Sequence, residues 1–258
     1  MRGWLAEASG AVASVFFPAG CRICELLLEG ASRVPICQEC LASFEAPSEK
    51  KCDICGQALG WMTTAEEQTA CRTCQQKTYA FDRARSYGIY EGPLVRAILL
   101  LKWERMDPLG RWFAERLAEM ARREGETLAA DVVVPVPLHR DRERERGYNQ
   151  AGLISKPLAR RLGLPHKAVL LMRTRPRPNK QVLSLEERWE SVRGAFATRP
   201  GSQVDNKRVL LVDDVMTTGA TLDACARALL ESGAKSVLGL TVARAARNPL
   251  PAPDSGNL

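Results

Sequence analysis

Beyond residue 80, short apolar runs alternate with segments whose apolar positions recur at helical spacing. The clearest apolar run, Asp131–Val136, is rich in valine and typical of a strand buried on both faces of a sheet. The pattern predicts strands at residues 84–90, 131–136, 168–172, 208–212 and 236–242. It predicts helices at residues 93–103, 109–122, 149–162, 185–192 and 221–231. Since strands that alternate with long helices pair in parallel through crossover connections, we expect an α/β fold.

The first 78 residues carry a different pattern, in which closely spaced cysteines replace the long apolar runs. Eight of the nine cysteines form four Cys-x-x-Cys pairs: Cys21/Cys24, Cys37/Cys40, Cys52/Cys55 and Cys71/Cys74. Two such pairs on tight turns aim four thiolates at one metal ion, so the pattern predicts two structural zinc sites. Four disulfides are the alternative, and they require an oxidising compartment. The short gaps favour pairing in sequence order, and interleaved pairing stays open.

Two apolar segments bear on where the protein resides. The run Pro93–Leu101 is interrupted by Arg96 and is shorter than the roughly 18 apolar residues that cross a bilayer, so we expect no membrane insertion. Near the N-terminus, Trp4–Phe17 contains Glu7, and its apolar residues recur at helical spacing. We interpret Trp4–Phe17 as an amphipathic helix rather than an export signal, and we expect a cytoplasmic protein.

Composition and charge both change near residue 78. We expect residues 1–78 to form the N-terminal helix and a double zinc ribbon, residues 79–247 the α/β domain and residues 248–258 a disordered tail. The net charge of +7 divides into −2 for residues 1–80 (7 Lys and Arg, 9 Asp and Glu) and +9 for residues 81–258 (30 and 21). The basic part favours anionic partners such as phosphates or nucleic acid, although a solvated basic surface would give the same charge.

One segment combines a buried strand, two acids and a small-residue turn. The run Arg208–Val212 delivers Asp213 and Asp214 to the end of its strand, and Thr217–Thr221 follows at the start of a helix. Neighbouring carboxylates repel each other unless a hydroxyl-rich ligand, a metal ion or solvent separates their charges. The hydroxyls and amides of the turn form a cradle for a phosphate group at the helix N-terminus. The segment therefore predicts a ribose 5-phosphate site, with both carboxylates on ribose hydroxyls.

Several motifs resemble those of known families. The segment Val209–Thr221 resembles the signature of the type I phosphoribosyltransferases, which bind phosphoribosyl pyrophosphate (PRPP). The motifs Val134–Arg140 and Arg146–Ala151 are similar to those of the ComF family, which is associated with DNA uptake in natural transformation. Gln181–Arg188 and the paired zinc ribbons extend this resemblance over nearly the whole chain. It implies a type I phosphoribosyltransferase-like parallel sheet with flanking helices, preceded by a small Cys-rich zinc-ribbon domain.

The resemblance also implies roles for the residues that match these motifs. Asp213 and Asp214 would be catalytic and engage the ribose hydroxyls, with Mg²⁺ nearby. Five residues of the turn would bind the 5′-phosphate: Thr217, Thr218, Gly219, Ala220 and Thr221. Three residues after the strand at 131–136 would bind pyrophosphate: Leu138, His139 and Arg140. The chain departs from many type I enzymes at Leu222, where those enzymes carry an acid.

A basic loop follows the strand predicted at 168–172. Residues 173–180 contain four cations and no acid: Arg173, Arg175, Arg177 and Lys180. Prolines in this segment indicate a loop. We predict that this flexible loop, with Arg177, Lys180 and Gln181, closes over the pyrophosphate and excludes water. An exposed loop that contacts DNA is the alternative.

Two other basic features have simpler interpretations. The run Arg140–Arg146 alternates arginines with acids, and we interpret it as a salt-bridged, solvated turn. Lys102 lies at the end of a predicted helix, where we expect it to cap the last carbonyl groups.

Two functions are consistent with these observations. The first is a Mg²⁺-dependent phosphoribosyltransferase that acts on PRPP and a nitrogenous acceptor. The second is a non-catalytic PRPP sensor or scaffold that contacts single-stranded DNA or proteins of the competence machinery. Residues 1–80 are acidic overall, which argues against DNA binding by the zinc ribbons alone. The chain contains no P-loop, dinucleotide-binding or Gly-x-Ser-x-Gly motif, which argues against the enzyme classes that use them.

Overall fold

The computed structural model describes residues 20–28, 33–44, 50–59, 69–176, 184–202 and 204–245. The predicted helix at 4–17 and the predicted tail at 248–258 lie outside these ranges. The same holds for three residues of the predicted flexible loop: Arg177, Lys180 and Gln181.

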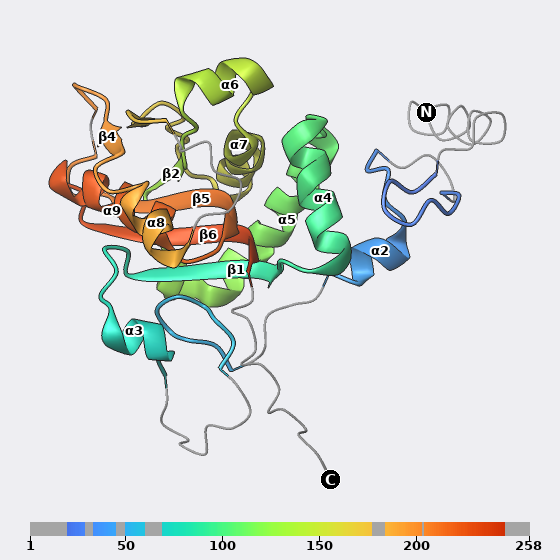
Figure 1. The fold of residues 1–258 in the computed structure, drawn as a ribbon, viewed down its shortest axis with the longest axis horizontal. Helices are drawn as coiled ribbons and strands as arrows, with labels where there is room; N and C mark the ends of the chain where they lie inside the picture. The colour runs from blue at the N-terminus through green and yellow to red at the C-terminus, as the bar shows by residue number, and fades with distance from the viewer. Residues whose placement is uncertain are drawn as a thin grey trace, which may run out of the picture.

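The centre of the fold is a four-stranded parallel sheet (Figure 1). It contains β1 (Arg83–Ile89), β2 (Val132–Pro135), β5 (Arg208–Met216) and β6 (Ser236–Arg244) in the order β1-β6-β5-β2. The two central strands, β5 and β6, are largely apolar because helices or other segments cover both of their faces. The expected α/β fold with a parallel sheet is confirmed. Strand β5 runs through the two acids to Met216, beyond its predicted end.

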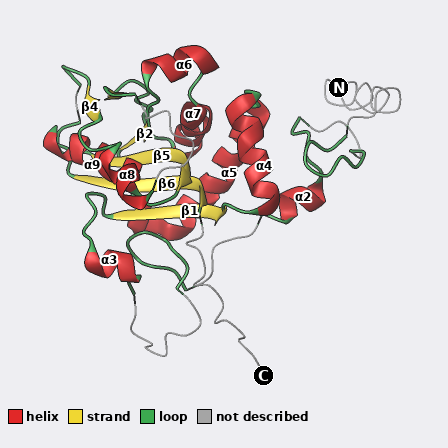
Figure 2. Cartoon of the chain, in the orientation of Figure 1, coloured by secondary structure: helices red, strands yellow, loops and turns green. Residues whose placement is uncertain are grey.

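Helices cover both faces of this sheet (Figure 2). The covering helices are α4 (Gly92–Trp103), α5 (Asp107–Glu124), α7 (Gln150–Leu162) and α9 (Ala220–Glu231). Leu210 and Val212 of β5 pack in one core with α4, α5 and α7, whereas Val209 and Leu211 pack in another with α9. Since successive side chains of a strand point to opposite faces, α9 lies on the face opposite to the other three helices. No helix in the described part of the chain is long and apolar enough to cross a membrane.

Three features outside the central sheet differ from the prediction. The strand predicted at 168–172 lies at Leu171–Arg173 (β3) and pairs antiparallel with β4 (Phe196–Thr198) in a separate sheet. The sequence pattern does not predict β4, because three residues are too few to show alternation. Arg140–Arg146 forms the exposed helix α6 rather than a turn, because His139 accepts a hydrogen bond from Asp141 N at its start and Gly147 ends it in the left-handed conformation. Two further short elements lie in this part of the chain: α8 (Leu185–Glu190) and η1 (Gly125–Leu128).

The two cysteine-rich segments belong to different hydrophobic cores. Of the first segment the structure describes residues 20–28 and 33–44, and of the second residues 50–59 and 69–76. The first ends in α2 (Gln38–Ala42), and Phe44 after this helix packs on Trp112 of α5 with ring centroids 5.5 Å apart. The second ends in α3 (Arg72–Gln76), and its cysteines join the core that contains α9 and Tyr79. Figure 1 shows α2 beside α4 and α3 on the other side of the sheet from it. The segments therefore attach to the sheet separately.

The second cysteine-rich segment also covers the edge of the sheet. Ala84 N of β1 donates a hydrogen bond of 2.7 Å to Ile54 O. Arg85 Nη1 donates to Asp53 O at 2.9 Å, and its Nε lies 3.0 Å from a carboxylate oxygen of Glu124 in α5. These contacts cover the start of β1, on the side of the strand that faces away from β6. The domain boundary near residue 78 stays a prediction.

Candidate functional site

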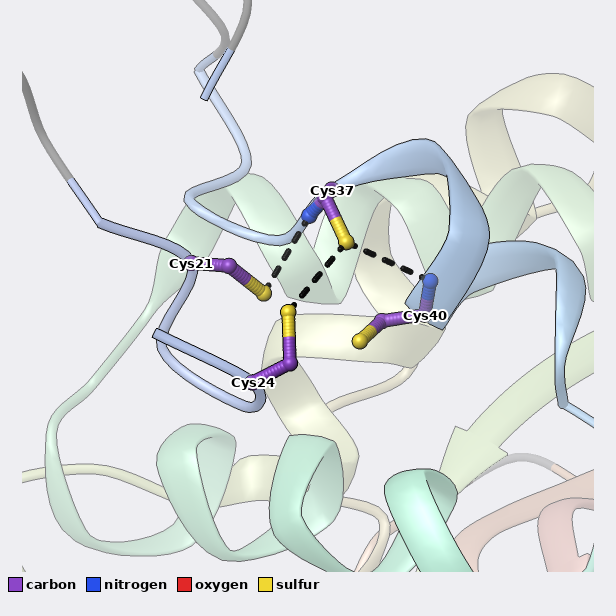
Figure 3. Close-up of side chains that lie close together, drawn as sticks. All are labelled: Cys21, Cys24, Cys37 and Cys40. Carbon is purple, nitrogen blue, oxygen red and sulfur yellow. Dashed lines mark hydrogen bonds between the residues drawn. The ribbon is translucent and has the colours of Figure 1, made fainter. Parts of the chain in front are cut away.

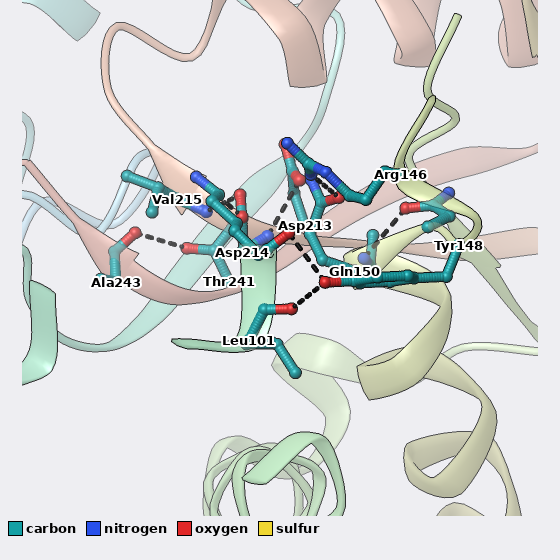
Figure 4. A network of polar contacts seen from close by, with 12 residues as sticks. Leu101, Arg146, Tyr148, Gln150, Asp213, Asp214, Val215, Thr241 and Ala243 are labelled. Carbon is teal, nitrogen blue, oxygen red and sulfur yellow. Dashed lines mark hydrogen bonds and ion pairs between the residues drawn. The ribbon is translucent and has the colours of Figure 1, made fainter. Parts of the chain in front are cut away.

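Asp213 and Asp214 lie in the carboxyl-terminal half of β5, just before the strand ends at Met216. Asp214 is 4% exposed, and Asp213 is half-buried. Asp214 N donates a hydrogen bond of 2.9 Å to Asp213 Oδ1, and Val215 N donates one of 2.7 Å to Asp214 Oδ1. Each carboxylate is thus fixed by the backbone of the next residue (Figure 4). Open α/β sheets bind their ligands beyond this carboxyl edge of the strands.

Lys102 reaches this pair of acids from the last turn of α4. Its Nζ lies 2.9 Å from Asp214 Oδ2. The prediction that Lys102 caps the carbonyls of its own helix is wrong, because Tyr148 takes that position. Tyr148 Oη lies 3.0 Å from Leu101 O and 2.8 Å from Lys102 O (Figure 4). It also accepts a hydrogen bond of 2.8 Å from Arg105 N. The tyrosine hydroxyl occupies the helix end and leaves the lysine to pair with Asp214.

Burial and neighbouring charge shift the proton affinities of this site. Burial raises the pKa of Asp213 well above its ordinary value of 3.8, and the charge of Asp214 raises it further. Burial alone would lower the pKa of Lys102, but the charges of Asp214 and Asp213 outweigh it and raise that pKa above 10.5. Lys102 therefore stays charged, and Asp213 holds its proton to a higher pH than an exposed aspartate does. A divalent cation or a pair of hydroxyl groups at these oxygens would stabilise the second negative charge.

The turn after β5 is the segment in which the sequence predicts a phosphate cradle. The five predicted phosphate-binding residues lie together here and in the first turn of α9: Thr217, Thr218, Gly219, Ala220 and Thr221. Gly219 is the N-cap of α9 with a φ of +82°, and it brings no side-chain acceptor to the first helical amides. A Cβ there would lie 2.9 Å from Met216 Cε and 3.0 Å from Tyr79 Cε1. Tyr79 Oη donates a hydrogen bond of 3.1 Å to Thr218 O and holds the turn in place. Helix amides and threonine hydroxyls are the donors that an anion needs.

The predicted pyrophosphate-binding residues directly follow β2: Leu138, His139 and Arg140. Because β2 and β5 pair in parallel, the residues after each strand meet at the same edge of the sheet. His139 is the N-cap of α6, and its Nδ1 accepts a hydrogen bond of 3.4 Å from Asp141 N. Asn149 Nδ2 donates to Val136 O at 3.0 Å, which fixes the exit of β2 against the start of α7. The structure gives these residues the expected place, and their roles stay predictions.

The sequence prediction gives no role to three further residues that contact one another: Trp103, Arg146 and Gln150. Arg146 Nη1 donates a hydrogen bond of 2.6 Å to Gln150 Oε1, and its guanidinium lies 4.9 Å from the ring centroid of Trp103. Gln150 is 6% exposed, whereas Trp103 is 64% exposed. In the sequence, the motif Arg146–Ala151 marks the family resemblance, but it does not by itself predict that Arg146 contacts Trp103.

Each cysteine cluster brings four sulfur atoms together, all within 4.8 Å of one another. The first cluster consists of Cys21, Cys24, Cys37 and Cys40 (Figure 3). The second consists of Cys52, Cys55, Cys71 and Cys74. The pairs combine in sequence order, which confirms that expectation over interleaving. All nine cysteines are free, and the sulfurs of Cys24 and Cys37 are 3.6 Å apart, which is longer than a disulfide bond of about 2.0 Å.

Donor groups around the sulfurs suit the thiolate form. Cys21 Sγ accepts hydrogen bonds of 3.4 Å from the amides of Ile23 and Cys37. In the second cluster, Arg244 Nη2 donates to Cys55 Sγ at 3.4 Å. Hydrogen bonds and positive charge stabilise a thiolate, which is the form that binds zinc. Each cluster can therefore hold one tetrahedral zinc ion.

Comparison with known proteins places the chain among relatives. A family model described as "Phosphoribosyl transferase domain" matches residues 150–254. "DNA utilization protein YhgH" of Salmonella typhimurium is 31% identical over 223 residues, which cover 85% of this chain and 94% of that protein. "Competence protein F" of Haemophilus influenzae is 29% identical over 213 residues, covering 81% and 89%. "Competence protein ComFC" of Bacillus subtilis is 39% identical over 116 residues, covering 44% of each chain.

Proposed function

This chain belongs to the ComF family, and from that premise we propose that it binds PRPP at Asp213–Thr221 and supports DNA uptake in natural transformation. The observation that carries the proposal is the ion pair of Lys102 with Asp214 beside the turn at Gly219. It sets Asp214 with its ionic partner, the protonatable Asp213 and a helix N-terminus at one edge of the sheet. In this proposal the protein acts in the cytoplasm, and residues 79–247 form the PRPP-binding domain.

The proposed binding mode uses the two acids and the turn together. Asp213 and Asp214 accept hydrogen bonds from the two ribose hydroxyls of PRPP. Hydroxyl donors favour the charged carboxylate, so Asp213 releases its proton when the sugar binds. Lys102 pairs with Asp214 and holds its carboxylate in place. The amides and hydroxyls of Thr217–Thr221 bind the 5′-phosphate.

The proposed reaction is transfer of the ribose 5-phosphate to a nitrogenous acceptor. The bond between the anomeric carbon and pyrophosphate breaks, and its electron pair leaves on a pyrophosphate oxygen. A bond to the acceptor nitrogen forms, and the proton of that nitrogen passes to solvent. Mg²⁺, held by Asp213 and Asp214, would neutralise charge on the leaving group, since carboxylate oxygens are ligands that Mg²⁺ prefers.

Two groups of residues would act on the pyrophosphate in this mechanism. The residues at the end of β2 that would bind it are Leu138, His139 and Arg140. The loop residues that would close over it and exclude water are Arg177, Lys180 and Gln181. In the same proposal each cysteine cluster binds one structural zinc ion. The bonds between zinc and the thiolates stabilise the two cysteine-rich segments against their hydrophobic cores.

The exposed side chain of Trp103 favours a second function, contact with single-stranded DNA with or without catalysis. Trp103 is 64% exposed, and Arg146 lies over its ring. Bases stack on such rings with about 1–3 kcal/mol per base. Trp103→Ala should weaken binding of a fluorescent oligonucleotide about tenfold and leave the PRPP affinity unchanged. Equal oligonucleotide affinity of the two proteins would remove this candidate, and proteins of the competence machinery would then be the partners to examine.

The test of PRPP binding is calorimetric titration of PRPP with Mg²⁺ into the full chain. The matched variant is Asp213→Asn/Asp214→Asn, which keeps the shape of both side chains and removes their charge. We expect micromolar binding by the wild-type protein and none by the variant. A folded wild-type protein that binds no PRPP would refute the proposal.

A further inference from the structure

A cavity of about 310 Å³ lies between the second cysteine-rich segment and the turn after β5. Arg72 and Lys77, from α3 and the residue after it, line one side. Thr217 and Thr218 of the turn line another side, and Arg244 at the end of β6 lines the cavity as well. Three parts of the chain that are distant in sequence therefore meet around one space of a size that accepts a small ligand.

Arg244 is the unusual member of this lining. It is 8% exposed. Its Nη2 donates hydrogen bonds of 3.4 Å to Cys55 Sγ and to Gln57 Oε1. Its Nε and Nη1 are buried and have no hydrogen-bond partner among the residues that the structure describes. Buried guanidinium donors without partners are costly, so this arrangement indicates that a group outside the described chain completes the site.

The charge of the lining indicates what that group is. Arg72, Lys77 and Arg244 are cations, and Glu186 at the start of α8 is the one acid among the lining residues. Lys77 Nζ also lies 2.9 Å from the ring centroid of Trp189, which keeps the ammonium group at the cavity. Guanidinium donors match the oxygens of a phosphate group, and threonine hydroxyls can add further donors.

We propose that the second cysteine-rich segment forms one wall of an anion site in which Arg244, Arg72 and Lys77 bind the phosphate group of a small phosphorylated ligand. The inference rests on the proposed function for the identity of that ligand, because Thr217 and Thr218 are shared with the proposed PRPP site. The phosphate itself comes from bound PRPP or from a separate phosphate ion. In either case, the cysteine cluster positions a ligand-binding arginine in addition to stabilising the fold.

The experiment is calorimetric titration of the full, zinc-loaded chain, first with inorganic phosphate and then with PRPP and Mg²⁺. Arg244→Met keeps the apolar stem of the side chain and removes its donors. We expect it to weaken phosphate binding by at least about tenfold, as loss of a charge-assisted hydrogen bond does. Arg72→Gln/Lys77→Gln changes side chains at the rim and should weaken binding about threefold to tenfold. Arg161→Met, which removes an exposed arginine on α7, is the matched control and should bind as the wild type does.

The zinc content of Arg244→Met decides whether the phosphate affinity of this variant tests the proposal. If Arg244→Met retains both zinc ions and binds phosphate as tightly as the wild type, the proposal is overturned. If this variant loses zinc, the rim variant decides, and unchanged phosphate binding by that variant overturns the proposal. The proposal is also overturned if the wild-type protein binds no inorganic phosphate and neither variant changes the PRPP affinity.

The same titrations distinguish a failure of the anion-site proposal from a failure of the proposed function. Asp213→Asn/Asp214→Asn should lose PRPP and keep inorganic phosphate. Phosphate binding that depends on Arg244 in a protein that binds no PRPP would sink the proposed function and leave the anion site intact. PRPP binding by a protein in which neither the phosphate affinity nor the PRPP affinity depends on Arg244, Arg72 and Lys77 would do the reverse. A PRPP affinity that falls together with the phosphate affinity identifies PRPP as the source of the phosphate group.

Discussion

Lys102 Nζ in the last turn of α4 lies 2.9 Å from Asp214 Oδ2 in the carboxyl-terminal half of β5. Asp214 is buried, and a buried carboxylate without a partner is strongly destabilising. The pair therefore allows β5 to carry an acid into the edge of the core. It also leaves Asp213, whose pKa is raised, as the acid whose protonation responds to a ligand.

Removal of the Lys102 side chain should lower the free energy of unfolding. Lys102→Met should lower the free energy of unfolding by about 3 kcal/mol, because it leaves the carboxyl group of Asp214 buried without its ionic partner. The double variant Lys102→Met/Asp214→Asn should recover most of that loss, since it removes both charges. Urea unfolding of both proteins measures the difference. The exposed Lys235→Met serves as the control, and a Lys102 variant as stable as this control would contradict the prediction.

Asp213 should make stability depend on pH with a defined sign. Its pKa in the folded chain lies well above 3.8, so the folded state keeps a proton that the unfolded state has already released. The free energy of unfolding should therefore fall as pH rises from near 3.8 toward the folded pKa. Asp213→Asn removes this contribution, so its stability advantage over the wild type should grow across that range. Unfolding curves at a series of pH values test this, and a constant difference would rule it out.

Gly219 should tolerate no side chain. Gly219→Ala forces a Cβ into a backbone with φ of +82° and to within 2.9 Å of Met216 Cε. We expect a loss of about 1–3 kcal/mol in the free energy of unfolding and weaker PRPP binding, because the turn must move. Gly152→Ala in α7 is the matched control, since its Cβ would make an ordinary contact of 3.7 Å with Asn149 Cβ. Thermal unfolding and calorimetry measure both effects, and equal behaviour of the two variants would count against the prediction.

The two cysteine clusters should bind and lose zinc independently. Elemental analysis should find two zinc ions per chain, and Cys24→Ser and Cys55→Ser should each lose one. Cys55 is 1% exposed in the core that contains α9, whereas Cys24 is exposed. Loss of the second zinc should therefore lower the free energy of unfolding more. Cys225→Ala, outside both clusters, should keep two zinc ions. One zinc ion per wild-type chain would show that the clusters are not equivalent metal sites.

Local patterns were sufficient to predict most elements of this site. The apolar run before Asp213 predicts a buried strand, because the run is short and contains β-branched residues. The small residues around Gly219 predict a tight turn, because side chains restrict the backbone there. The Cys-x-x-Cys spacing predicts metal knuckles, because two thiolates so close in sequence can face one ion. Each of these patterns spans only a few consecutive residues of the sequence.

The sequence by itself determined the parallel α/β architecture, the place of the acids and the cysteine pairs, since each depends on neighbours along the chain. Only the tertiary structure decided that Tyr148 occupies the end of α4 and that Lys102 turns to Asp214. It alone brought Arg244 beside Cys55 and set the two cysteine clusters in different cores. These contacts join residues far apart in the sequence, and the packing of whole elements against the sheet selects among partners that local chemistry makes equally suitable.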